Sequence, residues 1–293
     1  MQSPAVDEAR GLTAAQLDAI EDLERRVLAH DGGRLKLEWG SLRRRPPDEV
    51  NDFFVFDAGI LVGFCGMYVF GREPELAGAV DPDHRRRGIG SALLGRALGH
   101  LARRGRTKVL LVAPDATKAG RRFALAKGAT LDHSEHHLEL VGPPLGPPEP
   151  RPSTAGLRIR PAGGADGSSI VPILQDAFGE GAADAGGTGP DDLAFVAERD
   201  GDVVGALRVE LVGPSAGIYG LAVRPDLRGQ GIGRAVLYEV CLEARRRGAR
   251  SVTLEVETDN DRALGLYTSV GFERRTTEDY FALRVPAAAS SDP

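Results

Sequence analysis

The sequence predicts an α/β (α+β) fold made of two tandem copies of one domain, each a mixed, mostly antiparallel sheet flanked by helices. Three observations predict it. Residues 79–128 recur at 222–271 with a constant spacing of 143 positions and no gap, which indicates an internal repeat. Each copy starts with hairpin-like strands and continues as strand, helix, strand, an order that mixes antiparallel and parallel pairing. A proline-rich segment separates the copies.

The domain boundaries follow from that segment. Residues 142–156 are rich in proline, which cannot join a sheet ladder and favours extended geometry, so we interpret them as a semi-rigid linker. Residues 1–141 form the N-terminal copy and residues 157–293 form the C-terminal copy. A chain of 293 residues with 42% hydrophobic residues is long enough for two cores.

Charge and cysteine content exclude several classes of protein. A formal net charge of -5 argues against a nucleic-acid binder. Two cysteines provide no disulfide framework and suit a reducing cytoplasm, where we expect a monomer or homodimer. The first residues lack the basic and apolar regions of a signal peptide, and no apolar run approaches the ~20 residues needed to cross a bilayer. We therefore expect a cytoplasmic protein without a nucleic-acid or membrane partner.

The N-terminal copy opens with an amphipathic helix over 12–29, where Leu17, Ile20 and Leu23 recur at helical spacing and Thr13 with Gln16 can form a capping box. Alternation over 34–39 predicts a strand. After it we expect a hairpin in which strands at 53–56 and 60–70 are joined by a turn at 57–59, and then a strand at 76–80. A glycine turn at 88–90 leads into a helix that ends at about 104. The copy closes with a strand at 109–112, a helix at 117–127 and a strand near 136–141.

The C-terminal copy repeats this order. A helix over 170–178 contains Pro172 in its first part, and a glycine-rich loop follows at 179–189. We expect strands at 157–160, 193–198, 203–211, 218–223, 251–257 and 280–285, and further helices at 234–247 and 261–269. The acceptor determinants are expected in the loop 179–189 and in the helix 12–29.

The most specific stretch joins a strand end to a helix start at residues 219–233. Gly229, Gly231 and Gly233 precede the helix, so several backbone N–H groups and the positive end of the helix dipole can face an anion such as a pyrophosphate. Arg228 and Arg234 flank the turn and can add charge-assisted contacts. The turn is not a P-loop, because no Gly-Lys-Ser/Thr follows, and it is a poor dinucleotide-binding fingerprint.

The spacing Arg228-x-x-Gly231-x-Gly233 resembles the acyl-CoA-binding motif of the GCN5-related N-acetyltransferase (GNAT) family. Asn260-x-x-Ala-x-x-x-Tyr267, followed by Gly-Phe, matches a second pattern of that family. The resemblance implies acetyl-CoA as acyl donor, no metal, and a splayed strand that receives the pantetheine. The cofactor-binding residues that it implies are Leu221, Ala222, Val223, Arg228, Gly229, Gln230, Gly231, Ile232, Gly233, Arg234 and Asn260, and in the first copy Val80, Arg85, Arg86, Arg87, Gly88, Ile89 and Gly90.

The resemblance also implies the catalytic pair. Tyr267 would be the general acid near the thioester sulfur, although core packing is its plainer reading. The Leu-Glu-Val stretch is similar to the bacterial ribosomal-protein alanine acetyltransferases, in which a glutamate twelve residues before the tyrosine is the base, and Glu255 has that spacing. Strand alternation places Glu257 on the same face, so Glu257, Glu210 and water stay open as alternative bases.

The two copies differ in these polar groups. At the constant spacing, Glu255, Asn260 and Tyr267 align with Val112, Thr117 and Ala124, so the C-terminal copy is expected to be the catalyst and the N-terminal copy degenerate. The layout is similar to that of mycothiol synthase. We expect an acyl-CoA-dependent N-acyltransferase that acetylates a primary amine of a small molecule or peptide.

Three alternatives stay open: a CoA-binding regulatory module without catalysis, a Rossmann-like nucleotide binder, and acetylation of a thiol-sugar amine as in mycothiol synthase. A further feature is the group His133, His136 and His137. Adjacent His136 and His137 point to opposite faces of a strand, so we do not expect a metal site there.

Overall fold

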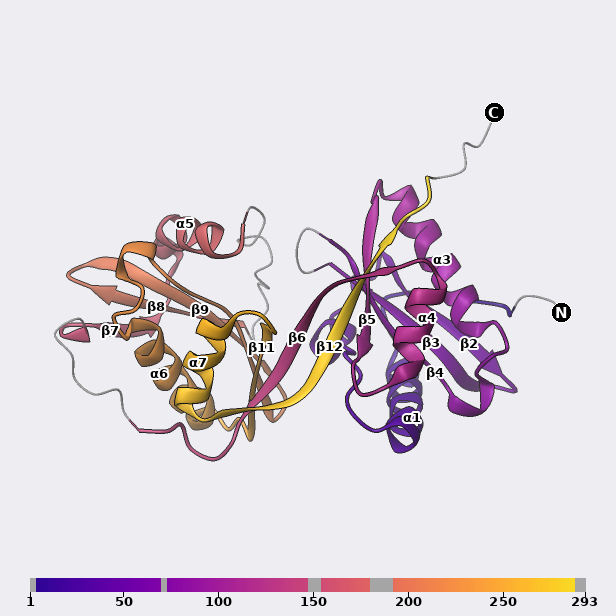
Figure 1. Cartoon of the computed structure of the whole chain (residues 1–293), viewed down its shortest axis with the longest axis horizontal. Helices are drawn as coiled ribbons and strands as arrows, with labels where there is room; N and C mark the ends of the chain where they lie inside the picture. Colours follow the sequence, from indigo (N-terminus) through magenta and orange to yellow (C-terminus); the bar gives the residue numbers. More distant parts are fainter. Residues whose placement is uncertain (1–3, 70–72, 147–153, 180–191, 288–293) are drawn as a thin grey trace. The chain divides into compact units, whose positions relative to one another are not determined.

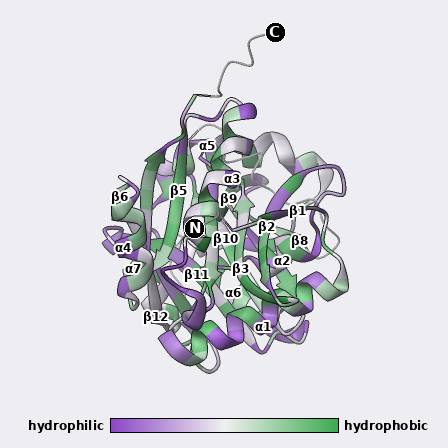
Figure 2. Cartoon of the chain, turned by 90° about the vertical axis from the view of Figure 1, so that its right-hand side faces the viewer, coloured by the Kyte–Doolittle hydropathy of each residue, from purple (hydrophilic) through white to green (hydrophobic). Residues whose placement is uncertain are grey.

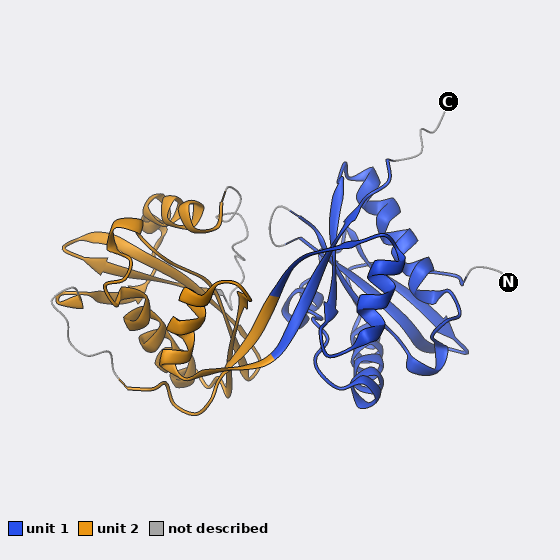
Figure 3. Cartoon of the chain, in the orientation of Figure 1, with its two compact units in different colours: residues 1–134, 276–293 blue, residues 135–275 orange. Residues whose placement is uncertain are grey.

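The computed structural model describes residues 4–69, 73–146, 154–179 and 192–287 (Figure 1). The chain divides into two compact units (Figure 3). Unit 1 contains residues 1–134 and 276–293, and unit 2 contains residues 135–275. Both have a mixed α/β fold in which most strand pairs are antiparallel, as the sequence predicted.

Unit 1 has the strand order β1-β2-β3-β4-β5-β12. Pairing is antiparallel except between β4 and β5. The strands are β1 (Asp7–Arg10), β2 (Val50–Asp57), β3 (Ile60–Tyr68), β4 (Glu75–Val80), β5 (Lys108–Pro114) and the second part of β12 (Phe272–Arg284), and the helices are α1 (Ala14–Asp31), α2 (Trp39–Arg43), α3 (Ile89–Arg103) and α4 (Lys118–Ala126).

The start of unit 1 confirms one prediction and corrects another. Helix α1 begins with the predicted capping box between Thr13 and Gln16. The predicted strand at 34–39 is wrong: no strand forms there, and α2 begins at Trp39. Its alternating pattern instead buries Leu37 without a ladder partner. The first strand, which the sequence did not reveal, is β1, a short edge strand paired with β2.

Unit 2 has the strand order β6-β11-β10-β9-β8-β7. Only β10 and β11 pair in parallel. Its strands are β7 (Arg158–Pro161), β8 (Asp192–Arg199), β9 (Asp202–Val212), β10 (Ser215–Val223), β11 (Ser251–Glu257) and the second part of β6 (Thr130–Leu140), and its helices are α5 (Gly167–Phe178), α6 (Ile232–Arg246) and α7 (Asp261–Val270).

The last strand of each sequence copy pairs in the other unit. From Glu135 onward β6 belongs to unit 2 and pairs with β11, whereas from Thr276 onward β12 belongs to unit 1 and pairs with β5. This division differs from the predicted boundaries at 141 and 157. Sequence order cannot reveal it, because either copy offers an antiparallel edge of similar apolar pattern.

Three clusters of buried hydrophobic side chains form the cores of the two units among the described residues. In unit 1, one buried cluster lies under α3 and α4 and a second lies under α1 and α2, so both sheet faces are packed. In unit 2, one cluster contains the buried residues of β6, β8 to β11 and α6. Helix α1 is banded with hydrophilic and hydrophobic residues, as expected of a helix with one buried face (Figure 2). Among the described residues, no helix is long and apolar enough to cross a membrane.

Candidate active site

The strand before the glycine turn of unit 2 is splayed from its neighbour. Strand β10 pairs with β11 from Ser215 to Ile218 and the ladder ends there. The following residues, which include Leu221 and Val223, continue beside β9 alone. A strand that leaves its partner exposes main-chain N–H and C=O groups that a ligand amide can pair with. The splay implied by the family resemblance is therefore present in unit 2.

A β-bulge interrupts the pairing of β10 with β9 just after β10 has left β11. The register between β10 and β9 shifts between Tyr219 and Ala222. Gly220 within it has φ +61°, a left-handed conformation that glycine adopts without a Cβ penalty. The bulge turns peptide groups away from the β9 ladder at the same place where β11 has already diverged. Main-chain groups near Gly220 are thus left without a ladder partner on either side of β10.

The glycine turn leads directly into α6. Gly229 and Gly231 have φ +79° and +87°, and Gly231 is the N-cap of α6 without a side-chain cap. Because the first N–H groups of a helix have no intrahelical acceptor, the amides of Ile232, Gly233 and Arg234 are left for an anion. A Cβ on Gly233 would lie 3.4 Å from Leu266, so this glycine also permits close packing of α6 on α7.

The predicted phosphate-binding arginines have other partners. Arg228 donates from Nε to the carbonyl of Val223 at 2.9 Å and forms an ion pair with Asp176 of α5. Arg234 donates from Nη2 to the carbonyl of Ser269 at 3.2 Å. Both guanidinium groups hold main-chain elements together, and the turn also presents its own backbone N–H groups.

A further basic residue, which is not among those predicted from the sequence, lies beside the turn. Arg262, in the first turn of α7, places Nη2 3.9 Å from the position of a Cβ on Gly229. Its side chain is exposed, and among the described residues it has no ion-pair partner. Its only sequence signal was that the N-terminal copy has Ala119 at the aligned position.

Asn260 and Tyr267 lie at the start and in the last part of α7. Asn260 is the N-cap of α7, and its Oδ1 accepts a hydrogen bond from the N–H of Ala263 at 3.1 Å. Tyr267 packs partly buried against the core of unit 2, with its ring 6.3 Å from that of Phe272. Burial raises the pKa of Tyr267 to about 12, so its phenol stays protonated at neutral pH.

Glu255 lies on β11, and the alternation expected for this strand is confirmed. Leu254 and Val256 are buried in the core, whereas Glu255 and Glu257 share the opposite face. Glu255 is 20% exposed and faces His137 of β6, whose Nδ1 lies 3.8 Å from Oε1. Glu257 is exposed. Glu210 accepts a long hydrogen bond of 3.5 Å from the hydroxyl of Tyr219.

Unit 1 keeps the turn and lacks the bulge. Gly88 caps α3 with φ +85°, and Arg85 bonds the carbonyl of Val80 and the carboxylate of Asp31, as Arg228 does with its own partners. Strand β4 pairs with β3 without a register shift. Pro4 lies 3.8 Å from the position of a Cβ on Gly88, and Gly88 itself is exposed.

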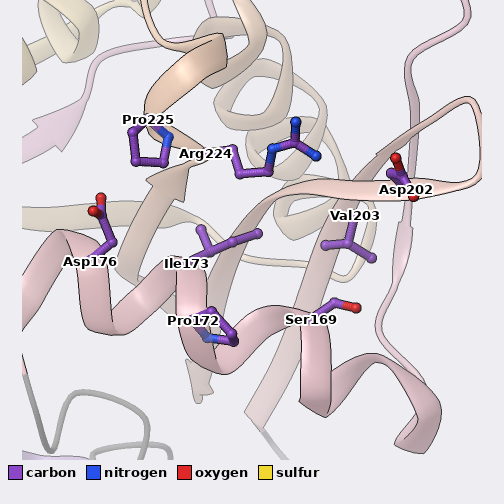
Figure 4. Close-up of a pocket in the computed structure, with 8 residues that line it drawn as sticks. All are labelled: Ser169, Pro172, Ile173, Asp176, Asp202, Val203, Arg224 and Pro225. Atoms are coloured by element: carbon purple, nitrogen blue, oxygen red, sulfur yellow. The ribbon is translucent and has the colours of Figure 1, made fainter.

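A cavity of about 380 Å³ lies on the other side of the unit 2 turn (Figure 4). It is lined by α5, β9 and the turn, and none of the predicted site residues belongs to the lining: Ser169, Pro172, Ile173, Asp176, Asp202, Val203, Arg224 and Pro225. Within the described ranges, no three His, Cys, Asp or Glu side chains converge as a metal site would require, including His133, His136 and His137.

Comparisons with known proteins show the family of this chain. A model of the acetyltransferase (GNAT) family matches residues 171–272, and a model of the acetyltransferase (GNAT) domain matches residues 49–124. The mycothiol acetyltransferase of Kytococcus sedentarius is 29% identical over 91% of this chain and 94% of its own length. That of Thermobispora bispora is 30% identical over 90% of both chains.

The fold comparison covers nearly the whole chain. The crystal structure of a GCN5-related N-acetyltransferase from Sphaerobacter thermophilus has a TM-score of 0.78 and 20% identity, and the match covers 97% of both chains. Two family matches along one sequence confirm the predicted tandem layout. The protein therefore belongs to the GNAT acetyltransferase family and is an N-acetyltransferase with two GNAT domains.

Proposed function

We propose that unit 2 transfers an acetyl group from acetyl-CoA to a primary amine, with Glu255 as base and Tyr267 as acid. The observation that carries the proposal is the splayed and bulged end of β10, which continues into the uncapped N-terminus of α6. This one continuous backbone offers donors to a pantetheine amide, a thioester oxygen and a diphosphate.

The chain's own residues would divide the reaction as follows. Glu255 accepts a proton from the substrate ammonium group, which leaves a neutral amine. The amine nitrogen attacks the thioester carbonyl carbon and the C–N bond forms. The nitrogen of the tetrahedral intermediate then loses its second proton to solvent, and the C–S bond breaks with its electron pair leaving on sulfur. Main-chain N–H groups at the bulge stabilise the oxyanion, and the Tyr267 hydroxyl faces the departing thiolate.

The raised pKa of Tyr267 limits its role. A thiol has a reference pKa of about 8.5. Proton transfer from a phenol of pKa about 12 is therefore uphill by roughly 5 kcal/mol. Tyr267 contributes mainly by donating a hydrogen bond to the developing thiolate, and solvent completes the protonation. Its protonated state at neutral pH makes it a constant donor.

Steady-state release of CoA with a panel of primary amines tests the proposal. We expect Glu255→Gln to lower kcat/KM by about 10³-fold, the range of a lost general base. The matched change Glu257→Gln, on the same face of the same strand, is expected to leave the rate within about twofold. If the protein binds acetyl-CoA but acetylates none of the amines in the panel, the result would instead support a regulatory CoA-binding module.

A second candidate acceptor follows from the relatives. Enzymes named mycothiol acetyltransferase match more than nine tenths of this chain at 29% identity. The amine of a thiol-sugar conjugate is therefore the first acceptor to place in the panel. A preference for simple amines or peptides over that conjugate, measured as kcat/KM, would assign this chain a different acceptor from those relatives.

A further inference from the structure

The histidine opposite Glu255 comes from the other sequence copy. His137 lies on β6, before the linker, and its Cα pairs directly with that of Glu255 on β11. Directly opposed residues of an antiparallel pair project to the same sheet face. The base proposed for unit 2 therefore has a neighbour that the C-terminal copy, residues 157–293, does not encode.

The environment of His137 is unusual for a surface strand. Its side chain is 14% exposed, and Nδ1 is enclosed without a hydrogen-bond partner. The Oε1 atom of Glu255 lies 3.8 Å from this nitrogen, slightly beyond hydrogen-bond distance. A small rotation of either side chain brings the two atoms together. An enclosed nitrogen without a partner is costly, so such a bond relieves a penalty as well as adding an interaction.

The charged groups around His137 are mostly acidic. On its own strand, Glu135 and Glu139 share its face, and on β11 Glu255 and Glu257 lie opposite. Glu139 already accepts hydrogen bonds from Ser251 and from Arg275 of β12. Among these carboxylates Glu255 pairs directly with His137 and lies within ion-pair distance of its Nδ1.

We propose that His137 is a positioning residue for Glu255. Its Nδ1–H donates to Oε1, which holds the carboxylate in one orientation, favours its ionised form and directs Oε2 to the acceptor amine. The inference rests on the proposed role of Glu255 as base. It goes beyond that role, because it makes the site of unit 2 depend on a strand encoded in the first copy.

The pH dependence of kcat/KM in full-length variants tests this inference. His137→Ala removes the hydrogen-bond donor, which makes the Glu255 carboxylate easier to protonate. We therefore expect the acidic limb of the pH profile of kcat/KM to move to higher pH by about one unit. At neutral pH, kcat/KM should fall by about 10-fold. His137→Asn keeps an amide donor near the position of Nδ1 and should recover most of both effects. His136→Asn, on the opposite face, is the matched control and should keep the wild-type profile.

A second measurement does not remove His137 and does not use activity. The ¹⁵N signal of its Nδ1 in nuclear magnetic resonance should move in Glu255→Ala, because the acceptor of its hydrogen bond is lost. An unchanged acidic limb of the pH profile in both His137 variants, or an unchanged Nδ1 signal, overturns the inference and leaves Glu255 as base. Wild-type activity in Glu255→Gln overturns the base assignment itself, which separates the two failures.

Discussion

Units 1 and 2 share a glycine turn and differ in the strand that leads to it. In unit 2, β10 contains a bulge at Gly220, whereas β4 of unit 1 stays in register with β3 to its end. A Cβ on Gly78 of β4 would lie 2.2 Å from the carbonyl of Phe64, so this glycine serves close backbone packing instead. Both strands leave their parallel partner before the turn, because β4 pairs with β5 only at Glu75 and Leu76. The comparison therefore identifies the bulge, rather than the splay, as the backbone difference between the two units.

The units also differ in the strand that pairs with β5 or with β11, which is β12 in unit 1 and β6 in unit 2. Tyr280 of β12 lies opposite Val112 in unit 1, at the position that His137 holds opposite Glu255 in unit 2. Tyr280 is buried, accepts a hydrogen bond from Lys36 and stacks on His133 at 4.3 Å. Unit 1 thus has a closed polar network where unit 2 has partly exposed acid–base groups.

The largest effect that sharpens this comparison is expected at Tyr267. Tyr267→Phe removes the donor to the thiolate and keeps the packed ring, so we expect kcat to fall by about 100-fold with a nearly unchanged dissociation constant for CoA. Rapid-mixing kinetics and calorimetry measure the two quantities. Tyr238→Phe on α6 is the control and should change neither.

The pH profile gives an independent check on Tyr267. Because burial raises the pKa of its phenol to about 12, the wild-type enzyme should show no loss of kcat from this group between pH 8 and 10. A descending limb near pH 9 that disappears in Tyr267→Phe would contradict its role as a protonated donor.

The next effect compares the two turns directly. Gly231→Ala and Gly88→Ala each force a side chain into the left-handed region, and each should lower the free energy of unfolding by about 1 kcal/mol. Only Gly231→Ala should weaken CoA binding, by about 10-fold, because a bulged strand precedes the turn of unit 2 and not that of unit 1. Equal losses of binding in the two variants would mean that both turns hold a donor.

A smaller effect is expected at Arg262. Arg262→Ala removes the exposed guanidinium beside Gly229, and we expect KM for acetyl-CoA to rise about fivefold with kcat unchanged. The rise should shrink at high salt, since an exposed charge contact is screened. Arg246→Ala, which removes an exposed arginine paired with Glu243, serves as the control. A KM for acetyl-CoA that does not change would exclude Arg262 from the donor site.

The smallest effect concerns Arg86, which aligns with Gly229. Arg86 has φ +65°, a conformation that costs a non-glycine residue about 1 kcal/mol. Arg86→Gly should therefore stabilise the protein by up to about 1 kcal/mol in denaturant unfolding and leave turnover unchanged. A destabilised variant would show that the Arg86 side chain makes a contact that outweighs its backbone strain.

Much of the fold was predictable from local patterns. The alternation of β11, the capping box of α1 and the glycine start of α6 are short-range features, and the structure confirms each of them. Strand β1 was missed because four residues at a sheet edge carry too little periodicity to detect. The pattern at 34–39 failed because the adjacent side chains of Lys36 and Leu37 are both buried, so burial does not follow the alternation of the sequence and the segment forms no strand.

The sequence by itself determined that two related domains follow one another, and it predicted that each carries an anion-binding turn and that only the second has the polar groups of a catalyst. Those properties depend on residue type and spacing. Tertiary structure decided that Arg228 and Arg234 hold main-chain groups, and that β6 brings His137 beside Glu255. The reason is that strand pairing and side-chain partners are set by long-range packing, and residues more than a hundred positions apart carry no local record of their contact.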